Sequence, residues 1–206
     1  PALVKPVIAP AEMVNEVEAK RILAEAGVPV VDERLATSAD EAGAAAAEIG
    51  FPVAMKLVST DIPHKSEIGG VLLGVVDETA ARDGYDTLIE RATAAQPDAK
   101  VDGVVIAPMI SGGVEIILGV KVDPAFGPVV LFGLGGIFVE LLQDVTQRLA
   151  PFGVEEAHEM MREVKGFPLL DGARGAPPAD TDALAEALSK LSQFAHENAE
   201  RIESID

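Results

Sequence analysis

The stretch that decides the fold is KLVSTDIPHKSEIGGV, residues 56–71. It begins inside an apolar run, 53–58, which is typical of a buried strand and holds Lys56 in its interior. A polar loop follows, with His64 near its centre, and it ends on Gly69-Gly70 before a second apolar run. Because a lysine inside an apolar strand is costly unless an anion meets it, the stretch predicts an anion site beside a strand.

The loop carries groups suited to phosphoryl chemistry. A histidine is largely neutral at cell pH, so a ring nitrogen of His64 can attack phosphorus. Glu67 is a candidate to fix the tautomer of His64 from its far ring nitrogen. The pair Gly69-Gly70 lets the backbone approach a phosphate closely and present N–H groups to it.

Each of these features also has an ordinary structural interpretation. Lys56 could extend its ammonium group to solvent from a strand end, and a loop histidine is more often a surface residue than a catalyst. A glycine pair alone could form a hairpin or a bulge. Only the combination of strand lysine, loop histidine and glycine pair favours a phosphate site.

Composition narrows the class of protein. The 206 residues suit one large domain or two small ones, and the scarcity of aromatic residues (4%) implies an aliphatic core. A net charge of −18 argues against a nucleic-acid partner. The absence of cysteine excludes disulfides and thiolate metal sites and fits the cytoplasm. No apolar run is long enough to cross a bilayer, so we expect no membrane contact.

The elements expected from periodicity and capping alternate irregularly, with short loops between strands. This pattern predicts an α+β fold or mixed sheets, and not a doubly wound parallel sheet. Residues 137–142 fit neither class by periodicity. Helices are expected at 12–26, 39–49 after a capping box at Ser38, 79–95, 155–164 and 182–196; strands are expected at 28–31, 53–58, 71–76, 101–107, 114–120 and 129–132.

Common phosphate-binding templates are missing. There is no G-x-x-x-x-G-K-[ST] motif. The run 133–137 (GLGGI) begins like a dinucleotide fingerprint, but Phe138 stands where the third glycine belongs. His158 and His196 lie in helical, carboxylate-rich stretches and are interpreted as surface histidines.

Taken together, these motifs resemble the ADP-forming acyl-CoA synthetases of the acetate–CoA ligase type. Residues 56–71 match the lysine strand and the H-K-S-[DE]-x-G-G-V loop of that family, and the likeness covers nearly the whole chain, from about residue 12 to 206. It continues through Ile106-Ala107-Pro108-Met109, Gly113-Val114-Glu115, 123–128, 132–136, Glu140, Asp144, 148–151 and 172–175.

The resemblance implies an ATP-grasp fold, in which two α+β subdomains clamp a nucleotide. Residues 1–11 would form a lead-in and 12–206 the ATP-grasp domain, with an uncertain boundary between its subdomains. His64 matches the family's mobile phosphohistidine. The residues expected at the nucleotide are Lys56 at the phosphates or base, Gly69 and Gly70 at the phosphate end, Pro108 and Met109 at the adenine-facing hinge, and Glu115 at the ribose or a phosphate.

The resemblance also implies cofactors, and here the chain departs from the family pattern. ATP or ADP is expected with Mg²⁺, which would bridge the nucleotide phosphates. Asp206 matches the first residue of a family strand that supplies metal ligands, but the rest of that strand is missing. The domain is therefore expected to be truncated at its C-terminus. Glu140 is a weaker metal or nucleotide candidate, and a buried carboxylate at a helix end is its alternative interpretation.

The function implied is that of an acid–thiol ligase. A CoA-binding domain or alpha subunit, carrying a second phosphohistidine, would pass a phosphoryl group to His64 and from there to ADP. A non-catalytic adenine-nucleotide-binding regulatory module is the alternative. A succinyl-CoA synthetase-like role is a weaker third, because the H-K-S-E loop argues against it. The sequence does not identify the acyl group.

Overall fold

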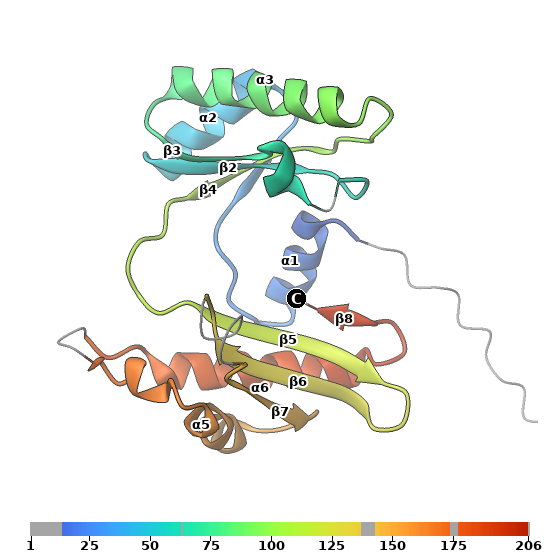
Figure 1. The fold of residues 1–206 in the computed structure, drawn as a ribbon, viewed down its shortest axis with the longest axis vertical. Helices are drawn as coiled ribbons and strands as arrows, with labels where there is room; N and C mark the ends of the chain where they lie inside the picture. Colours follow the sequence, from blue (N-terminus) through green and yellow to red (C-terminus); the bar gives the residue numbers. More distant parts are fainter. Residues whose placement is uncertain (1–13, 63, 137–142, 174–176, 206) are drawn as a thin grey trace, which may run out of the picture. The chain divides into compact units, whose positions relative to one another are not determined.

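The computed structural model describes residues 14–62, 64–136, 143–173 and 177–205. The chain divides into two compact units, each of which is α+β and contains an antiparallel sheet (Figure 1). Helices and an antiparallel sheet in each unit confirm the expected α+β class. The first unit comprises 1–12, 23–29 and 112–206, and the second comprises 13–22 and 30–111.

The second unit, which contains the decisive stretch, is a four-stranded sheet covered by two helices. The strand order is β1-β4-β2-β3, and every neighbouring pair is antiparallel. Its elements are β1 (Arg34–Ala36), α2 (Ala39–Ile49), β2 (Val53–Val58), η1 (Lys65–Ile68), β3 (Val71–Val75), α3 (Glu78–Ala95) and β4 (Gly103–Pro108).

Local sequence explains the helix ends of this unit. Ser38 caps α2 by accepting from the backbone N–H of Glu41, and Gly50 ends the helix with a positive φ. Asp77 caps α3 in the same way. Both helices pack over one face of the sheet, where Met55 and Leu57 of β2 are fully buried. Lys56, between them, therefore points to the opposite face of β2.

The first unit has a second four-stranded sheet, in the order β7-β6-β5-β8, with all neighbours antiparallel. Phe132 and Leu134 of β6 are fully buried in its core, together with Met160, Met161 and Leu188 from the helices. Its elements are β5 (Ile116–Asp123), β6 (Gly127–Leu134), β7 (Val145–Leu149), α5 (Val154–Glu163), η2 (Phe167–Leu169), α6 (Thr181–Glu197) and β8 (Ser204–Ile205).

Helix α1 (Glu16–Glu25) is shorter than the expected 12–26 and ends shortly before Gly27, whose φ is positive; its first turns belong to the second unit. Asn15 precedes it and accepts from the backbone N–H of Glu18 at 3.0 Å. The same side chain donates to Asp102 at 3.2 Å, which ties the start of the helix to the segment before β4. No helix among the described residues is long and apolar enough to span a membrane.

Three details differ from expectation. Residues 28–31 form no strand; β1 begins at Arg34, so propensity placed that strand too early. β3 was expected to be buried, yet it is the edge of its sheet and Leu73 is 69% exposed. Strand β7 was not predicted, because its polar alternation at 145–149 gives no buried-strand signal. The expectation for 137–142 lies outside the described residues.

Candidate functional site

A pocket of about 360 Å³ lies on the face of β2 away from α2 and α3. It contains the strand lysine, the loop histidine and the loop carboxylate that the sequence singled out. The first turn of α1 supplies its remaining wall. The lining residues are Glu16, Lys56, His64, Lys65, Ser66 and Glu67, all in the second unit.

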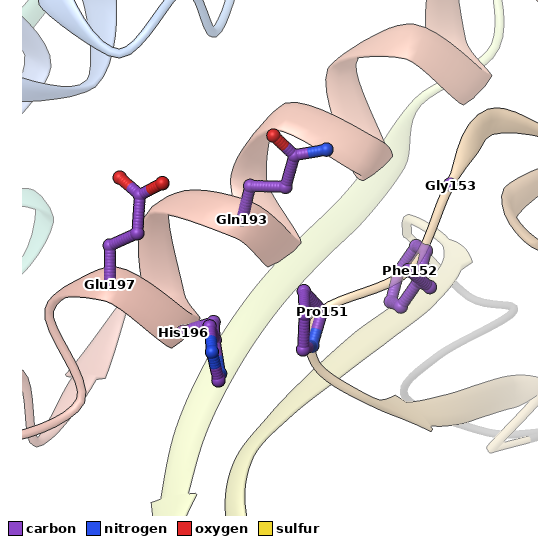
Figure 2. Close-up of a pocket in the computed structure, with 6 residues that line it drawn as sticks. All are labelled: Pro151, Phe152, Gly153, Gln193, His196 and Glu197. Carbon is purple, nitrogen blue, oxygen red and sulfur yellow. The ribbon is translucent and has the colours of Figure 1, made fainter.

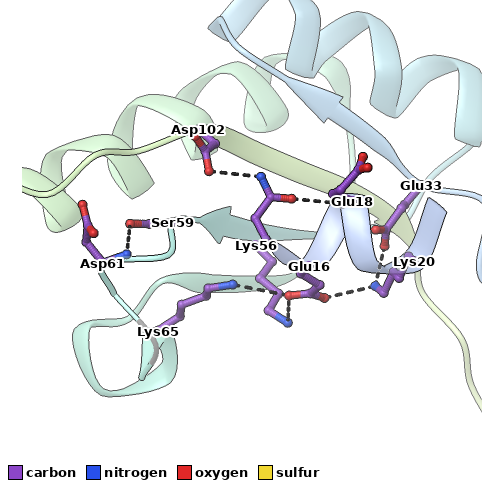
Figure 3. A network of polar contacts seen from close by, with 10 residues as sticks. Glu16, Glu18, Lys20, Glu33, Lys56, Ser59, Asp61, Lys65 and Asp102 are labelled. Carbon is purple, nitrogen blue, oxygen red and sulfur yellow. Dashed lines mark hydrogen bonds and ion pairs between the residues drawn. The ribbon is translucent and has the colours of Figure 1, made fainter. Parts of the chain in front are cut away.

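Glu16 is the centre of the ion pairs in this pocket (Figure 3). One of its oxygens, Oε2, lies 2.6 Å from the Nζ of Lys56 and 3.3 Å from the Nζ of Lys65. Its other oxygen, Oε1, lies 3.0 Å from the Nζ of Lys20. Lys20 in turn pairs with Glu33 at 2.8 Å. Three ammonium groups thus surround the carboxylate of Glu16.

The ion pairs shift the ionisation of the groups at their centre. Burial by itself raises the pKa of Glu16, but hydrogen bonds from Lys56 and Lys20, with their positive charges, outweigh it and lower the pKa to about 2. Burial by itself lowers the pKa of Lys20, and its bonds to Glu33 and Glu16 reverse this and raise it. Glu16 and Lys20 are therefore both charged at neutral pH.

Glu33 ends the chain of ion pairs. Its side chain is only 10% exposed, and one oxygen binds Lys20. The other oxygen, Oε1, is buried and has no hydrogen-bond partner among the described residues. A buried carboxylate oxygen without a partner is costly. The ion pair of the other oxygen with Lys20 offsets part of that cost and holds the ammonium group of Lys20 in place.

His64 precedes the short helix η1, Glu67 lies within it, and both residues line the pocket. The carbonyl of His64 accepts from the backbone N–H of Glu67 at 3.1 Å, which fixes the backbone of the turn. Both side chains are exposed. Within the described part of the chain the two side chains make no hydrogen bond to each other. Glu67 therefore does not orient the imidazole in this conformation, and that expected role stays a prediction.

The glycine pair shapes the loop from within. Gly69 caps η1 at φ 67°, and its N–H donates to Ser66 O at 3.2 Å. The N–H of Gly70 donates to Lys65 O at 2.7 Å, and a Cβ on Gly70 would lie 2.8 Å from that oxygen. Both N–H groups are thus bonded within the loop in this conformation, and the expected place of Gly69 and Gly70 at the phosphate stays a prediction. Arg91 also donates to Gly69 O, at 2.6 Å.

Pro108 and Met109 lie where β4 ends. Pro108 is opposite Val53 in the register of β4 and β2, and the backbone N–H of Met109 donates to Pro52 O at 3.3 Å. The second unit ends at Ser111, shortly after them. This place suits a hinge, but contact with adenine stays a prediction.

Glu115 belongs to the first unit and lies apart in sequence from the pocket around Lys56. Its carbonyl accepts from the N–H of Gly135 at 2.7 Å. A Cβ on Gly135 would lie 2.5 Å from the Glu115 side chain, so this glycine makes room for the carboxylate. The glycine run that resembled a dinucleotide fingerprint therefore has a packing role here, and the nucleotide contact of Glu115 stays a prediction.

The expected metal ligands, Glu140 and Asp206, both lie outside the described residues. Within the described ranges, no three His, Asp or Glu side chains lie close enough together to hold a metal ion. The described donors by themselves therefore do not form a Mg²⁺ site.

A second pocket, of about 380 Å³, lies in the first unit between α6 and the segment after β7 (Figure 2). His196 lines it and is exposed, as expected for a surface histidine. His158 is only partly exposed and its Nε2 lies 3.1 Å from Asp182, so it is less of a surface group than expected. The pocket is lined by Pro151, Phe152, Gly153, Gln193, His196 and Glu197.

Sequence reasoning missed Glu16, Lys20 and the role of Lys65. The i,i+4 spacing of Glu16 and Lys20 was a visible signal, but it also occurs on ordinary solvated helices. The approach of Glu16 to Lys56 joins residues far apart in the chain and depends on the tertiary fold.

Comparison with known proteins identifies relatives over the same span. A family model described as an ATP-grasp domain matches residues 8–206. The beta subunit of ADP-forming acetate–CoA ligase II from Pyrococcus furiosus is 44% identical over 191 residues, which is 93% of this chain and 81% of that protein. Its counterpart in ligase I of the same organism is 46% identical and is covered to 82%.

Solved structures of the acetyl-coenzyme A synthetase 1 of Ca. Korarchaeum cryptofilum are similar in sequence and fold. One, with coenzyme A, acetyl-coenzyme A and a phosphorylated phosphohistidine segment, has a TM-score of 0.85 and 40% identity, covering 93% of this chain and 83% of that chain. Another, with coenzyme A and Mg-AMPPCP, has the segment pointing towards its nucleotide site. Its TM-score is 0.76 at 40% identity, and the match covers 89% of this chain and 78% of that chain.

Proposed function

The chain belongs to the ATP-grasp family of ADP-forming acyl-CoA ligases, and from this membership we propose that His64 carries a phosphoryl group between the enzyme and ADP. The overall reaction is acyl-CoA + ADP + phosphate giving a carboxylic acid, CoA and ATP. The observation that carries the proposal is the shared pocket of His64, Lys56 and Lys65.

The step itself balances without a redox partner. In the direction of ATP synthesis, a terminal oxygen of ADP attacks the phosphorus of phosphohistidine, the P–N bond breaks, and a neutral imidazole remains. In the reverse direction a ring nitrogen of His64 attacks the γ-phosphorus of ATP and ADP leaves. The imidazole is exposed and free of side-chain hydrogen bonds within the described ranges, which suits a group that must accept and release phosphorus.

The lysines supply charge where phosphate oxygens would lie. Lys56 reaches the pocket from the central strand β2, so its position is fixed by the sheet. Its side chain is 39% exposed and thus accessible to a nucleotide phosphate. Gly69-Gly70 closes the loop that presents His64. Lysine ammonium groups aimed at the transferring phosphoryl group stabilise the charge that is spread over its oxygens.

The remaining assignments complete the proposal. We place adenine near Pro108 and Met109, and Glu115 at the ribose or a phosphate. Glu67 is assigned to the imidazole once the loop is loaded. Mg²⁺ would arrive with the nucleotide and offset phosphate charge, with Glu140 and Asp206 as its protein ligands. The partner is a CoA-binding domain or alpha subunit with its own phosphohistidine.

Labelling tests the proposal directly. The chain is incubated with ATP labelled in the γ-phosphate and Mg²⁺, and acid-labile, base-stable label on protein is counted. We expect His64→Ala to lose the label and the matched control His196→Ala to keep it. Equal label in His64→Ala would refute the role of His64. If ATP binds by calorimetry but the wild-type protein takes up no label even with the partner subunit, the non-catalytic nucleotide-binding module is favoured instead.

A further inference from the structure

Lys65 connects the His64 loop to helix α1 through a single ion pair. Its side chain is only 12% exposed, and its Nζ lies 3.3 Å from Oε2 of Glu16. Among the described residues, Glu16 is the one acidic partner of Lys65. The other attachments of the loop shown above are backbone contacts or, like the bond from Arg91 to Gly69 O, lie at its far end. The pair is therefore the side-chain contact that lies closest in sequence to His64.

The two residues of this ion pair differ in the number of other ionic partners that they have. Glu16 also binds Lys56 at 2.6 Å and Lys20 at 3.0 Å, so it keeps two partners if Lys65 leaves. Lys65 has no second carboxylate to replace Glu16 among the described residues. When the pair breaks, the lysine and its loop move, and Glu16 stays on the helix.

Phosphorylation of His64 changes the charge beside this pair. A phosphoryl group adds between one and two negative charges and three acceptor oxygens, on the residue next to Lys65. It would compete with Glu16 for the ammonium group and would repel the Glu16 carboxylate across the same pocket. Both effects weaken the bond of Lys65 to Glu16, which is the ion pair that ties the loop to α1.

We propose that the Glu16–Lys65 ion pair is a charge-sensitive latch that holds the unphosphorylated His64 loop against α1 and opens when His64 carries phosphate. Glu16 is thus a positioning residue that acts through Lys65. The opening half of the proposal rests on the proposed function, because it requires a phosphoryl group on His64. The holding half does not, because it concerns the unmodified protein.

Hydrogen exchange measures the holding half. The amides of Glu67, Gly69 and Gly70 are hydrogen-bonded within the loop, so their exchange reports its opening. We expect Glu16→Gln and Lys65→Gln to speed exchange in 64–70 about three- to fivefold, the upper part of the range for a solvent-accessible ion pair, and Lys65→Arg to restore protection. Glu18→Gln is the matched control, because Glu18 lies on the same helix and pairs with Arg21 outside the pocket.

These variants decide the holding half in either direction. A rise of less than threefold over Glu18→Gln in both glutamine variants would overturn the latch. Because Glu16→Gln also loosens Lys56 and Lys20, Lys65→Gln is the cleaner variant. It leaves the ion pairs of Glu16 with Lys56 and Lys20 in place, and its exchange outside 64–70 reports whether the protein stays folded. Failure of Lys65→Arg to restore protection would also overturn it.

Chemical phosphorylation measures the opening half without relying on catalysis. Phosphoramidate is used as the phosphoryl donor, with His64→Ala as the control for modification at other histidines. We expect phosphorylated wild-type protein to exchange in 64–70 as fast as unphosphorylated Lys65→Gln, and phosphorylation of Lys65→Gln to add less than twofold. Equal acceleration in both backgrounds, or none in wild type, would overturn the opening mechanism. Because the donor is chemical, a failure here is distinct from a failure of ATP labelling.

Discussion

Replacing Glu16 with glutamine removes the carboxylate that three lysines share, and the loss should depend on pH in a defined direction. The folded protein holds the pKa of Glu16 at about 2 against an ordinary value of 4.5. At about 1.36 kcal/mol per pKa unit, the stabilisation at neutral pH is at most about 3.4 kcal/mol. A quarter of the side chain is exposed, so solvent screening reduces our expectation to about 1–2 kcal/mol.

The sign follows from the direction of the shift. A carboxyl whose pKa is lowered by folding stabilises the protein fully above its unfolded pKa, and this stabilisation is lost as pH falls from about 4.5 towards 2. Wild type should therefore exceed Glu16→Gln in stability by about 1–2 kcal/mol at pH 7, and the difference should shrink below pH 4.5 and disappear towards pH 2.

The chain provides its own probe for this measurement. Tyr85 on α3 is the single tyrosine, there is no tryptophan, and it packs against the core of the unit that holds Glu16. Urea unfolding followed by its fluorescence, at several pH values, gives the difference between the two proteins. A difference that stays constant from pH 7 to pH 3, or no difference at pH 7, would refute the electrostatic argument.

Three further substitutions test other parts of the structure. Gly70→Ala places a methyl 2.8 Å from Lys65 O and should cost about 1–3 kcal/mol by the same fluorescence; an unchanged midpoint would contradict this packing. Phe132→Ala empties the core of the first unit and should cost about 3–5 kcal/mol by circular dichroism, leaving the tyrosine transition in place. Asp144→Asn leaves one of the two N–H groups of 165–166 without its acceptor and should cost about 1–3 kcal/mol, and hydrogen exchange that stays unchanged there would count against it.

Much of the fold was predictable because its signals are local. The cap at Ser38 and the stop at Gly27 depend on neighbouring backbone, and α2 and β2 lie where they were expected. The loop with His64 was equally visible, because an unusual set of residues stands within sixteen positions. Burial of β3 was mispredicted, because its apolar composition does not reveal that it lies at the edge of the sheet.

By itself, the sequence determined which residues are proposed for phosphoryl chemistry and in what order, since residue types and their spacing along 56–71 specify a strand lysine, a loop histidine and a glycine turn. Only the tertiary structure decided what surrounds them. Glu16 meets Lys56 and Lys65 because α1 packs beside β2, and no local pattern encodes that distance. The N–H groups of Gly69 and Gly70 turn inward for the same reason: backbone partners are chosen by the folded loop, whereas composition shows only that a sharp turn is possible.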